Sequence, residues 1–268
     1  MLINGEPGNT ISIRDRGLLY GDGVFRTFPV RNGIALHWPL HYQKLQHDCA
    51  ALKIACPDFE SLTSELQSLS DAQPDAIFKI IVTRGRSARG YAPAPDAVPT
   101  HIWDASPMPV YPDEWKTSGV TLRLCQLRLG HQLLLAGIKH LNRLENVLAA
   151  AELGDAAEGI LQDTEGHVIE GTRSNVFLVL KGRLITPDLS RCGVAGVQRD
   201  LVMSYAKEQG MAVEVRDVEL DELRAADELF LTNSVFGLWP VARFEERRWT
   251  DFSHAVRIRA WIERTDHG

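Results

Sequence analysis

Residues 170–177 read EGTRSNVF and follow an apolar pair, Val168-Ile169, that is typical of a buried strand. Glu170 therefore ends a predicted strand, and Asn175 follows five residues later. The plain alternatives are an exposed strand-end carboxylate for Glu170 and a loop side chain that satisfies nearby backbone for Asn175. If Asn175 instead orients the carboxylate, or a ligand beside it, the two residues mark a candidate binding site.

A second unusual stretch, GIKHLNRLE, occupies residues 137–145 and contains Lys139. It follows an apolar run at residues 133–138 and precedes a predicted helix, because apolar residues recur at helical spacing at Leu141, Leu144, Leu148 and Ala151. Burying a free ammonium group is costly, so lysine is uncommon in such a setting unless its amine reacts. The alternative for Lys139 is a solvated loop lysine ahead of a helix.

A lysine and a carboxylate are the two protein groups that pyridoxal phosphate (PLP) chemistry requires. Lys139 is the candidate that forms a Schiff base with the cofactor aldehyde. Glu170 is the candidate that keeps the pyridine nitrogen protonated, so that the ring accepts electrons. The pair alone makes PLP a possible cofactor, with Asn175 as a further candidate contact.

The phosphate of such a cofactor needs backbone N–H groups and hydroxyls. Gly196 and Val197 begin a predicted helix, and a helix N-terminus favours an anion. Thr232-Asn233-Ser234 is a second group of donors at a predicted strand end, with Asn233 and Ser234 as the candidate phosphate contacts. A glycine-rich turn before a helix is a weak signal alone, because plain loops share it.

Taken together, these motifs resemble the signature of the class IV (fold-type IV) PLP-dependent aminotransferases. The pattern runs from Glu170 through Asn175-Val176-Phe177 and Ile185-Thr186-Pro187 to residues 194–199, and the resemblance extends to residues 20–25. It implies an α/β (α+β) fold with a smaller N-terminal α/β domain and a larger, strand-rich C-terminal pseudo-barrel domain that binds PLP. Proline-rich residues suggest a linker at 109–118, which places the domains at residues 1–108 and 119–268.

Within this family, three further stretches resemble the aminodeoxychorismate lyases, namely residues 136–145, 41–46 and 83–91. The family pattern implies an arginine that contacts the cofactor phosphate after the motif histidine, and this chain has Lys44 there. Lysine keeps the positive charge and so still attracts the phosphate. It lacks the bidentate guanidinium, so the strength of the contact is in question.

The resemblance implies conversion of 4-amino-4-deoxychorismate to 4-aminobenzoate and pyruvate, a step of folate synthesis. Lys139 would serve as general base, and Glu170 would keep the ring an electron acceptor. Two alternatives stay open: an aminotransferase of the same fold acting on D- or branched-chain amino acids, and a PLP-binding protein without catalysis. A lyase releases pyruvate from the substrate and needs no keto-acid acceptor, so the product formed without such an acceptor distinguishes the lyase from an aminotransferase.

Residues on the open side of the cofactor are predicted from strand alternation and charge. Thr27 shares a strand face with Phe25, while Arg26 points to the other face, so Thr27 is the candidate catalytic hydroxyl. The substrate carries two carboxylates, for which the candidates are loop residues: Arg84, Arg86, Arg89 and Tyr91. Solvated loop charges are the alternative for each arginine.

Local signals in the first third predict one hairpin and one helix. Asn32-Gly33 joins two apolar stretches and supplies the positive φ of a type I′ hairpin turn. A helix is predicted from Pro39 to Ile54, with Pro57 beyond its end.

Composition excludes several classes of protein. The 268 residues are 44% hydrophobic and 24% charged with a net charge of −6, which is ordinary for a globular enzyme and gives no sign of nucleic-acid binding. The N-terminus lacks a signal-peptide pattern and no segment is long enough to span a membrane, so a cytoplasmic protein is expected. The four cysteines form no metal-binding pair, and no metal site is predicted. A homodimer is expected from the family.

Overall fold

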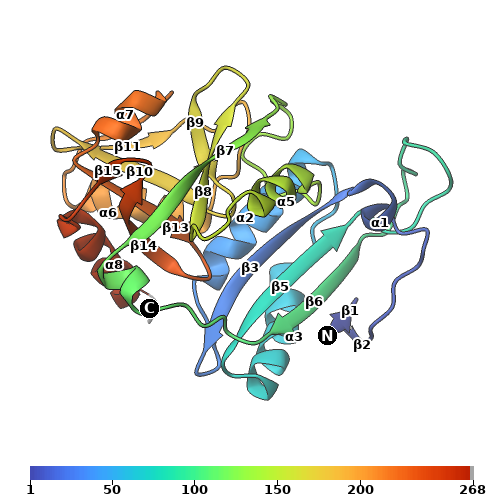
Figure 1. The fold of residues 1–268 in the computed structure, drawn as a ribbon. Coiled ribbons are helices and arrows are strands. Elements are labelled where there is room, and N and C mark those ends of the chain that lie inside the picture. The colour runs from blue at the N-terminus through green and yellow to red at the C-terminus, as the bar shows by residue number, and fades with distance from the viewer. Residues whose placement is uncertain (266–268) are drawn as a thin grey trace. The chain divides into compact units, whose positions relative to one another are not determined.

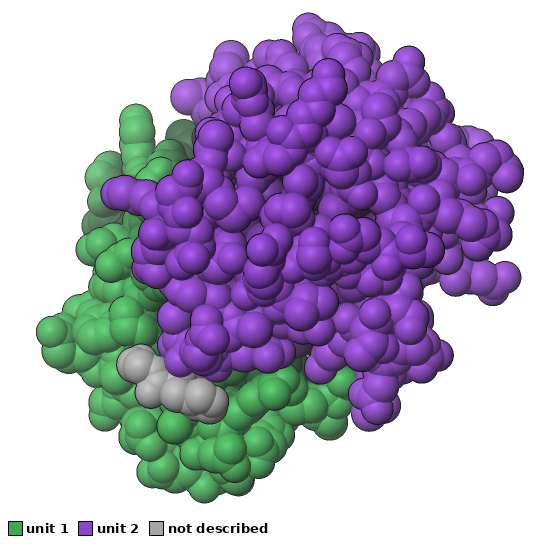
Figure 2. All heavy atoms as spheres, turned by 90° about the vertical axis from the view of Figure 1, so that its left-hand side faces the viewer, with its two compact units in different colours: residues 1–109, 138–142 green, residues 110–137, 143–268 purple. Residues whose placement is uncertain are grey.

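The computed structural model describes residues 1–265, and it confirms the mixed α/β class. The chain divides into two compact units, which Figure 2 colours separately. The first unit comprises residues 1–109 and 138–142, and the second comprises residues 110–137 and the chain from Arg143 onward. The first unit thus takes in a five-residue segment, 138–142, that lies far along the chain and contains Lys139.

The first unit contains a six-stranded antiparallel sheet in the order β2-β1-β6-β5-β3-β4 (Figure 1). Its elements are β1 (Leu2–Ile3), β2 (Glu6–Pro7), α1 (Arg16–Tyr20), β3 (Gly23–Arg31), β4 (Ile34–Ala35), α2 (Trp38–Ala51), α3 (Phe59–Ala72), β5 (Ala76–Thr83) and β6 (Thr100–Ser106). The predicted hairpin joins β3 to β4, where Asn32 and Gly33 have φ values of 51° and 77°. These positive values are those that the tight turn requires.

Helices α2 and α3 cover one face of this sheet and form its core (Figure 1). Proline near the start of α2 fits the first helical turn, and the Asp58 side chain caps α3 by accepting the Ser61 N–H at 2.8 Å. The core brings together apolar residues of both helices and three strands, including Phe28, Leu45, Leu62, Phe78 and Trp103. Burying each such side chain contributes about 1.5–3 kcal/mol to stability.

The second unit is built on a nine-stranded, half-barrel sheet in the order β12-β11-β10-β13-β14-β7-β8-β9, with β15 beside β14. Its strands are β7 (Val120–Leu129), β8 (Glu158–Asp163), β9 (Val168–Gly171), β10 (Asn175–Leu180), β11 (Arg183–Pro187), β12 (Val213–Arg216), β13 (Glu228–Asn233), β14 (Gly237–Phe244) and β15 (Arg247–Arg248). Its helices are α4 (Glu114–Thr117), α5 (Leu144–Ala151), α6 (Val197–Glu208), α7 (Leu220–Ala225) and α8 (Ser253–Thr265).

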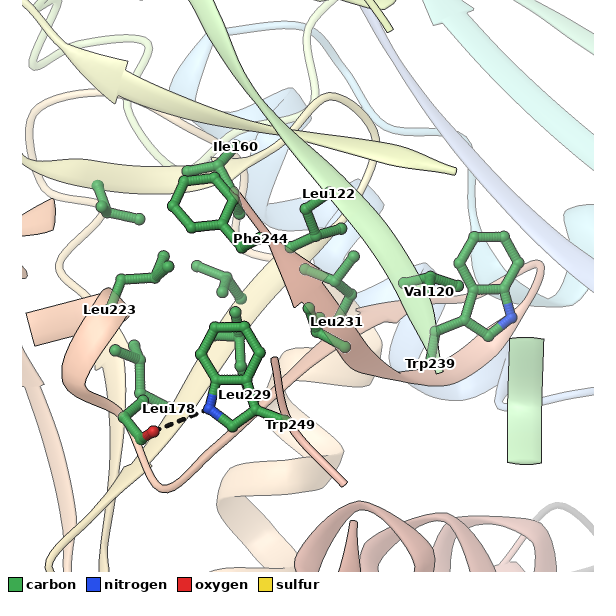
Figure 3. Packing of buried hydrophobic residues seen from close by; sticks show 14 of the residues in the cluster. Val120, Leu122, Ile160, Leu178, Leu223, Leu229, Leu231, Trp239, Phe244 and Trp249 are labelled. Atoms are coloured by element: carbon green, nitrogen blue, oxygen red, sulfur yellow. Dashed lines mark hydrogen bonds between the residues drawn. The ribbon is translucent and has the colours of Figure 1, made fainter. Parts of the chain in front are cut away.

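A large apolar cluster holds the second unit together (Figure 3). Leu178, Leu229 and Leu231 come from adjacent strands, because β10 pairs with β13. Trp249 closes one side of the cluster and donates its indole N–H to the Ala226 carbonyl at 2.8 Å. This bond satisfies the one polar atom of a buried indole. In the part of the chain that the structure describes, every helix is too short or too polar to span a bilayer.

Candidate functional site

The backbone around Lys139 pairs with the beginning of β3. The Phe25 N–H donates to the Lys139 carbonyl at 3.0 Å, and the Leu141 N–H donates to the Gly23 carbonyl at 2.9 Å. The ammonium group of Lys139 lies 4.7 Å from the centre of the Phe25 ring. Segment 138–142 therefore lies beside β3 through an isolated antiparallel bridge between Val24 and His140, which puts the Lys139 side chain on the same face as Phe25.

The same segment explains a glycine early in the chain. Gly21 has a φ of 64°, and a Cβ added there would collide with the side chain of Asn142. The Asn142 amide donates to the Gly21 carbonyl at 3.2 Å. Both the backbone conformation and the close approach therefore require glycine at this position.

A buried carboxylate on α2 holds the backbone of Lys139. Asp48 is fully buried, and its Oδ2 accepts the Lys139 N–H at 3.0 Å. The same oxygen forms an ion pair with buried Arg26, which compensates its charge. Asp48 was not among the residues predicted from the sequence. It lies on the same buried face of α2 as His41 and Leu45, and a carboxylate on an apolar helix face needs a partner.

His41 lies in the same buried stripe. Burial lowers the pKa of His41 well below its usual value, and the neighbouring positive charges of Arg26, His37 and Lys139 lower it further. The imidazole is therefore neutral at physiological pH and adds no further positive charge beside these groups.

Strand β3 presents alternate residues to opposite faces, as the sequence predicts. Arg26 is buried on the face that packs against α2, while Phe25 and Thr27 are only partly buried. Thr27 pairs across the strands with Lys79, whose ammonium group lies 4.8 Å from the Phe25 ring centre. Thr27 and Lys139 thus belong to one face of the unit.

Lys44 lies on α2, four residues before Asp48, and is half-buried. Its carbonyl accepts a hydrogen bond from the Arg26 guanidinium at 3.3 Å. The backbone of Lys44 is therefore tied to the same ion pair that holds Lys139.

The side chain of Arg84 anchors the beginning of the loop that also carries Arg89 and Tyr91. Arg84 donates to both oxygens of Asp22, at 2.8 and 3.0 Å, and to the carbonyls of Leu52 and Lys53. Most of its donors are thus used inside the unit.

Arg16, a buried residue that the sequence analysis missed, anchors the far end of this loop. It donates to the carbonyls of Gly90 and Tyr91 at 2.9 and 2.6 Å, and its Nε binds Asp22 at 2.7 Å. Arg86 and Arg89 are exposed, and the Tyr91 ring is 86% exposed, 5.4 Å from the Tyr20 ring.

In the second unit, Glu170 is buried in β9, and it fixes the segment that precedes α6. Its Oε2 accepts the Val194 N–H at 2.8 Å. Gly137 forms a parallel bridge with Val194, and its N–H donates to the Gly193 carbonyl at 2.9 Å. The carboxylate of Glu170 is therefore held in a defined orientation.

Asn175 holds the next residues of that segment. Its amide donates to the Val194 carbonyl at 2.7 Å, and its Oδ1 accepts the Gly196 N–H at 3.1 Å. Asn175 therefore spans the turn that leads into α6. Gly196 precedes the helix, Val197 is its first residue, and no side chain caps this end.

A buried hydroxyl lies beside this turn. Thr232 is adjacent to Asn175 across the strand pair β10 and β13, and its Oγ1 is buried without a hydrogen-bond partner among the described residues. Asn233 accepts the Val235 N–H at 2.7 Å and also binds the Arg173 carbonyl. Ser234 follows, half-buried. An uncapped helix end with an unpartnered hydroxyl is a donor set that could hold a phosphate group.

The predicted site residues thus fall into two groups. Lys139, Thr27 and Lys44 lie in the first unit with the arginine loop, and the others lie in the second: Glu170, Asn175, Gly196, Val197, Asn233 and Ser234. Thr232 joins the second group. Although it stands in the predicted donor cluster, its buried and unpartnered hydroxyl becomes evident only from the structure.

Comparisons with known proteins find relatives that match most of this chain. A lyase from Vibrio harveyi, aminodeoxychorismate lyase, is 36% identical over 90% of this chain and 89% of its own. A putative branched-chain-amino-acid aminotransferase from Methanocaldococcus jannaschii is 34% identical over 90% of this chain and 85% of its own.

A solved structure is similar over nearly the whole length. The crystal structure of 4-amino-4-deoxychorismate lyase from Pseudomonas aeruginosa superposes with a TM-score of 0.94, is 44% identical, and covers 98% of each chain. The family model for amino-transferase class IV matches residues 23–244, which include Lys139, Glu170 and Thr232. The chain belongs to the class IV aminotransferase family.

Proposed function

We propose that the protein is a PLP-dependent lyase that converts 4-amino-4-deoxychorismate to 4-aminobenzoate and pyruvate. The observation that carries this proposal is the 44% identity, over 98% of both chains, to a lyase of that name. The similarity to aminotransferases supports the same cofactor and leaves the reaction to be tested.

Lys139 would bind the cofactor aldehyde, and Glu170 its pyridine nitrogen. The N-terminus of α6 with Thr232, Asn233 and Ser234 would bind the phosphate, with Lys44 as an additional positive charge. When bound, the pyridine ring supplies an acceptor for the electron pair released at the substrate carbon. What supports these assignments is the held orientation of Glu170 and the unpartnered hydroxyl of Thr232.

The chain's own residues would move the protons. The Lys139 amine takes a proton from the substrate ring carbon and returns it to the departing enolpyruvyl group. Asp48 fixes the backbone from which that amine extends, and Phe25 lies beneath it. Thr27, on the same strand face as Phe25, is the proposed hydroxyl for orienting substrate.

Arg89 and Tyr91 are the proposed groups for a substrate carboxylate, because both are exposed on an anchored loop. Arg84 was predicted for the same role. Its hydrogen bonds to Asp22, Leu52 and Lys53 favour a supporting role behind this loop.

We propose a homodimer, as the family resemblance implies. Helix α5 exposes Leu144, Val147 and Leu148, which share one helix face. The preceding loop exposes Leu133 and Leu134, with exposed fractions of 73% and 81%. A second copy of the chain is the proposed cover for these apolar side chains. Light scattering of the purified protein measures this state. A cytoplasmic location stays a prediction.

The test supplies 4-amino-4-deoxychorismate to the PLP-loaded protein without a keto acid and measures 4-aminobenzoate and pyruvate. Equal amounts of both products are expected, and Lys139→Ala should form neither while losing the visible absorbance of the lysine–cofactor linkage. Half-transamination of D-alanine or leucine, without 4-aminobenzoate, would replace the lyase by an aminotransferase. Intact cofactor absorbance without either turnover would indicate a non-catalytic PLP protein.

A further inference from the structure

Two histidines and two carboxylates meet at the turn between β8 and β9. His131 follows β7, Asp163 ends β8, and Glu165 and His167 lie in the turn. Asp163 is fully buried, whereas the exposed fractions of the His131 and Glu165 side chains are 25% and 59%. The cluster is therefore built around a buried carboxylate and open to solvent on one side.

Backbone hydrogen bonds fix the orientation of Asp163. Its Oδ1 accepts the N–H groups of Glu165 and His167 at 3.0 and 2.9 Å. Its Oδ2 consequently faces two imidazole nitrogens, His131 Nε2 at 2.9 Å and His167 Nδ1 at 3.4 Å.

The other nitrogen of His167 also lies beside a carboxylate. Its Nε2 lies 3.4 Å from Glu219 Oε1. A carboxylate behind the outer nitrogen is also the usual surrounding of a metal-binding histidine.

Most distances between the candidate metal-ligand atoms are near those of a small divalent ion's coordination shell. Bonds of about 2.0–2.2 Å in a tetrahedral zinc site separate the ligand atoms by roughly 3.3–3.6 Å. Here His167 Nδ1 lies 3.4 Å from Asp163 Oδ2 and 3.8 Å from Glu165 Oε2. His131 Nε2 lies 2.9 Å from Asp163 Oδ2, so these two atoms must move apart to share an ion. The ligand atoms of His131, Asp163 and Glu165 all lie within 4.8 Å of one another. Small side-chain movements, easiest for exposed Glu165, would complete the set.

The charges around the cluster favour a cation overall. Four carboxylates lie in and around the cluster, those of Asp163, Glu165, Asp217 and Glu219. Arg191 opposes them, with its guanidinium 3.9 Å from Asp163 Oδ2, but it also forms an ion pair with Asp217. Mixed imidazole and carboxylate ligands select Zn²⁺ and its transition-metal neighbours over Mg²⁺ and Ca²⁺, which prefer oxygen ligands.

We propose that His131, Asp163, Glu165 and His167 bind one divalent transition-metal ion, with Zn²⁺ the best match. The site is separate from the residues assigned to PLP, and the proposal does not rest on the lyase activity. It runs against the absence of a metal site expected from the sequence. Because His167 directly precedes β9, the bound ion would stabilise the turn at the beginning of the strand that carries Glu170.

The experiment titrates Zn²⁺ into the PLP-loaded protein by calorimetry. Chelator treatment and removal of free PLP come first, because free PLP itself binds metals. Saturable binding of one equivalent is expected, together with a rise in melting temperature. His131→Gln and His167→Gln should each weaken binding by more than the roughly 10- to 100-fold that replacing a residue hydrogen-bonded to a metal ligand costs. Glu165→Gln, at an exposed position, should also weaken it.

His101→Gln is the matched control, because His101 likewise pairs with a carboxylate, Glu65, at 3.0 Å, but lies outside the cluster. It should bind Zn²⁺ as the unmodified protein does. The proposal is overturned if no saturable binding occurs. It is equally overturned if Glu165→Gln and the two cluster histidine variants bind Zn²⁺ with unchanged affinity, since the ion would then bind elsewhere and protonated histidines would account for the cluster.

Discussion

The carboxylate of Asp48 accepts the backbone N–H of Lys139 at 3.0 Å, across 91 residues of sequence. The same carboxylate oxygen forms an ion pair with Arg26 on β3, the strand with which the Lys139 segment pairs. One buried negative charge therefore joins α2, β3 and the segment that carries the proposed reactive lysine. We infer that Asp48 is a positioning residue for Lys139.

Replacing Asp48 by Asn should lower kcat by about 10- to 100-fold, because a shift of about 1 Å in a catalytic group has costs of that order. KM should change little, because Asp48 touches no proposed substrate group. Losing this negative charge also leaves Arg26 uncompensated, and both effects disfavour a positively charged lysine–cofactor linkage. The pKa of that linkage, read from its visible absorbance against pH, should fall.

Asp71→Asn provides the control for this change. Asp71 is an exposed residue on α3 in the same unit, and its carboxylate binds only the Gln67 amide among the described residues. It should leave kcat and the absorbance titration unchanged. Asp48→Glu should restore part of both. A variant Asp48→Asn that folds with normal kcat and an unshifted absorbance titration would refute the positioning role.

Replacing Thr232 by Val should weaken PLP binding while leaving the cofactor-free protein as stable or more stable. The hydroxyl is buried without a partner among the described residues, so its removal relieves a polar group that costs about 1–3 kcal/mol. A hydrogen bond to a charged phosphate contributes about 1.5–3 kcal/mol, which is roughly 10- to 150-fold in affinity. Equilibrium binding of PLP and urea unfolding of the cofactor-free protein measure the two effects.

Thr232→Ser should keep most of the affinity, because it retains the hydroxyl. Thr121→Val, at an exposed position on β7, should alter neither quantity. If Thr232→Val destabilises the cofactor-free protein and leaves PLP affinity unchanged, the hydroxyl serves folding and does not contact the phosphate.

Local sequence signals predicted several elements well, because their causes are local. The Asn32-Gly33 turn and a helix from Pro39 were both expected, and both are found, with α2 ending at Ala51. The helical spacing after Lys139 also correctly predicted α5. The spacing could not show whether the apolar face of α5 is covered, because coverage depends on a partner surface and not on periodicity. In the structure, Leu144 on this face is 75% exposed.

Candidate site residues could be proposed from the sequence only where a residue type has few other uses. Lys139 and Glu170 could be proposed because a lysine and a carboxylate in apolar stretches need a reason to be there. Asp48 and Arg16 were missed because their partners lie 91 and up to 75 residues away. A contact of that separation is created by the fold, and no local pattern in the sequence encodes it.

Acid should weaken the first unit through Asp22. Burial acts to raise the pKa of Asp22, but hydrogen bonds and positive charges of Arg84 and Arg16 outweigh it, so the pKa is lowered. A carboxylate with a lowered folded-state pKa stabilises the fold above its unfolded pKa of about 3.9, and this stabilisation is lost as the pH falls through the folded value. Asp22→Asn should therefore cost about 1.5–3 kcal/mol at pH 7.

The difference in unfolding free energy between the unmodified protein and Asp22→Asn should stay constant from pH 7 to about pH 4 and shrink below that. Urea unfolding at several pH values measures it. Asp71→Asn again serves as control and should cost less than about 0.5 kcal/mol throughout. A difference that already vanishes between pH 6 and 5 would show that Asp22 does not titrate below its ordinary range.

The same substitution at two arginines of one loop should affect different properties, namely stability at Arg84 and substrate binding at Arg89. Arg84 donates to Asp22, Leu52 and Lys53 inside the unit, whereas Arg89 is exposed. Arg84→Gln should therefore lower the unfolding free energy by about 1.5–3 kcal/mol, and it should not add fully to Asp22→Asn, because both changes remove the same ion pair. Arg89→Gln should leave stability within about 0.5 kcal/mol and raise KM for the dicarboxylate substrate.

The change in KM separates a substrate role for Arg89 from a solvated charge. Arg86→Gln provides the comparison, since Arg86 is an exposed arginine of the same loop. If Arg89 contacts a carboxylate, its loss should raise KM more than the loss of Arg86, and the excess should persist at high salt, where general attraction by the loop is screened. Equal, salt-sensitive effects of the two changes would mean that the loop attracts the substrate only through its overall charge, and the search for the carboxylate-binding group would move to the face that carries Thr27 and Lys79.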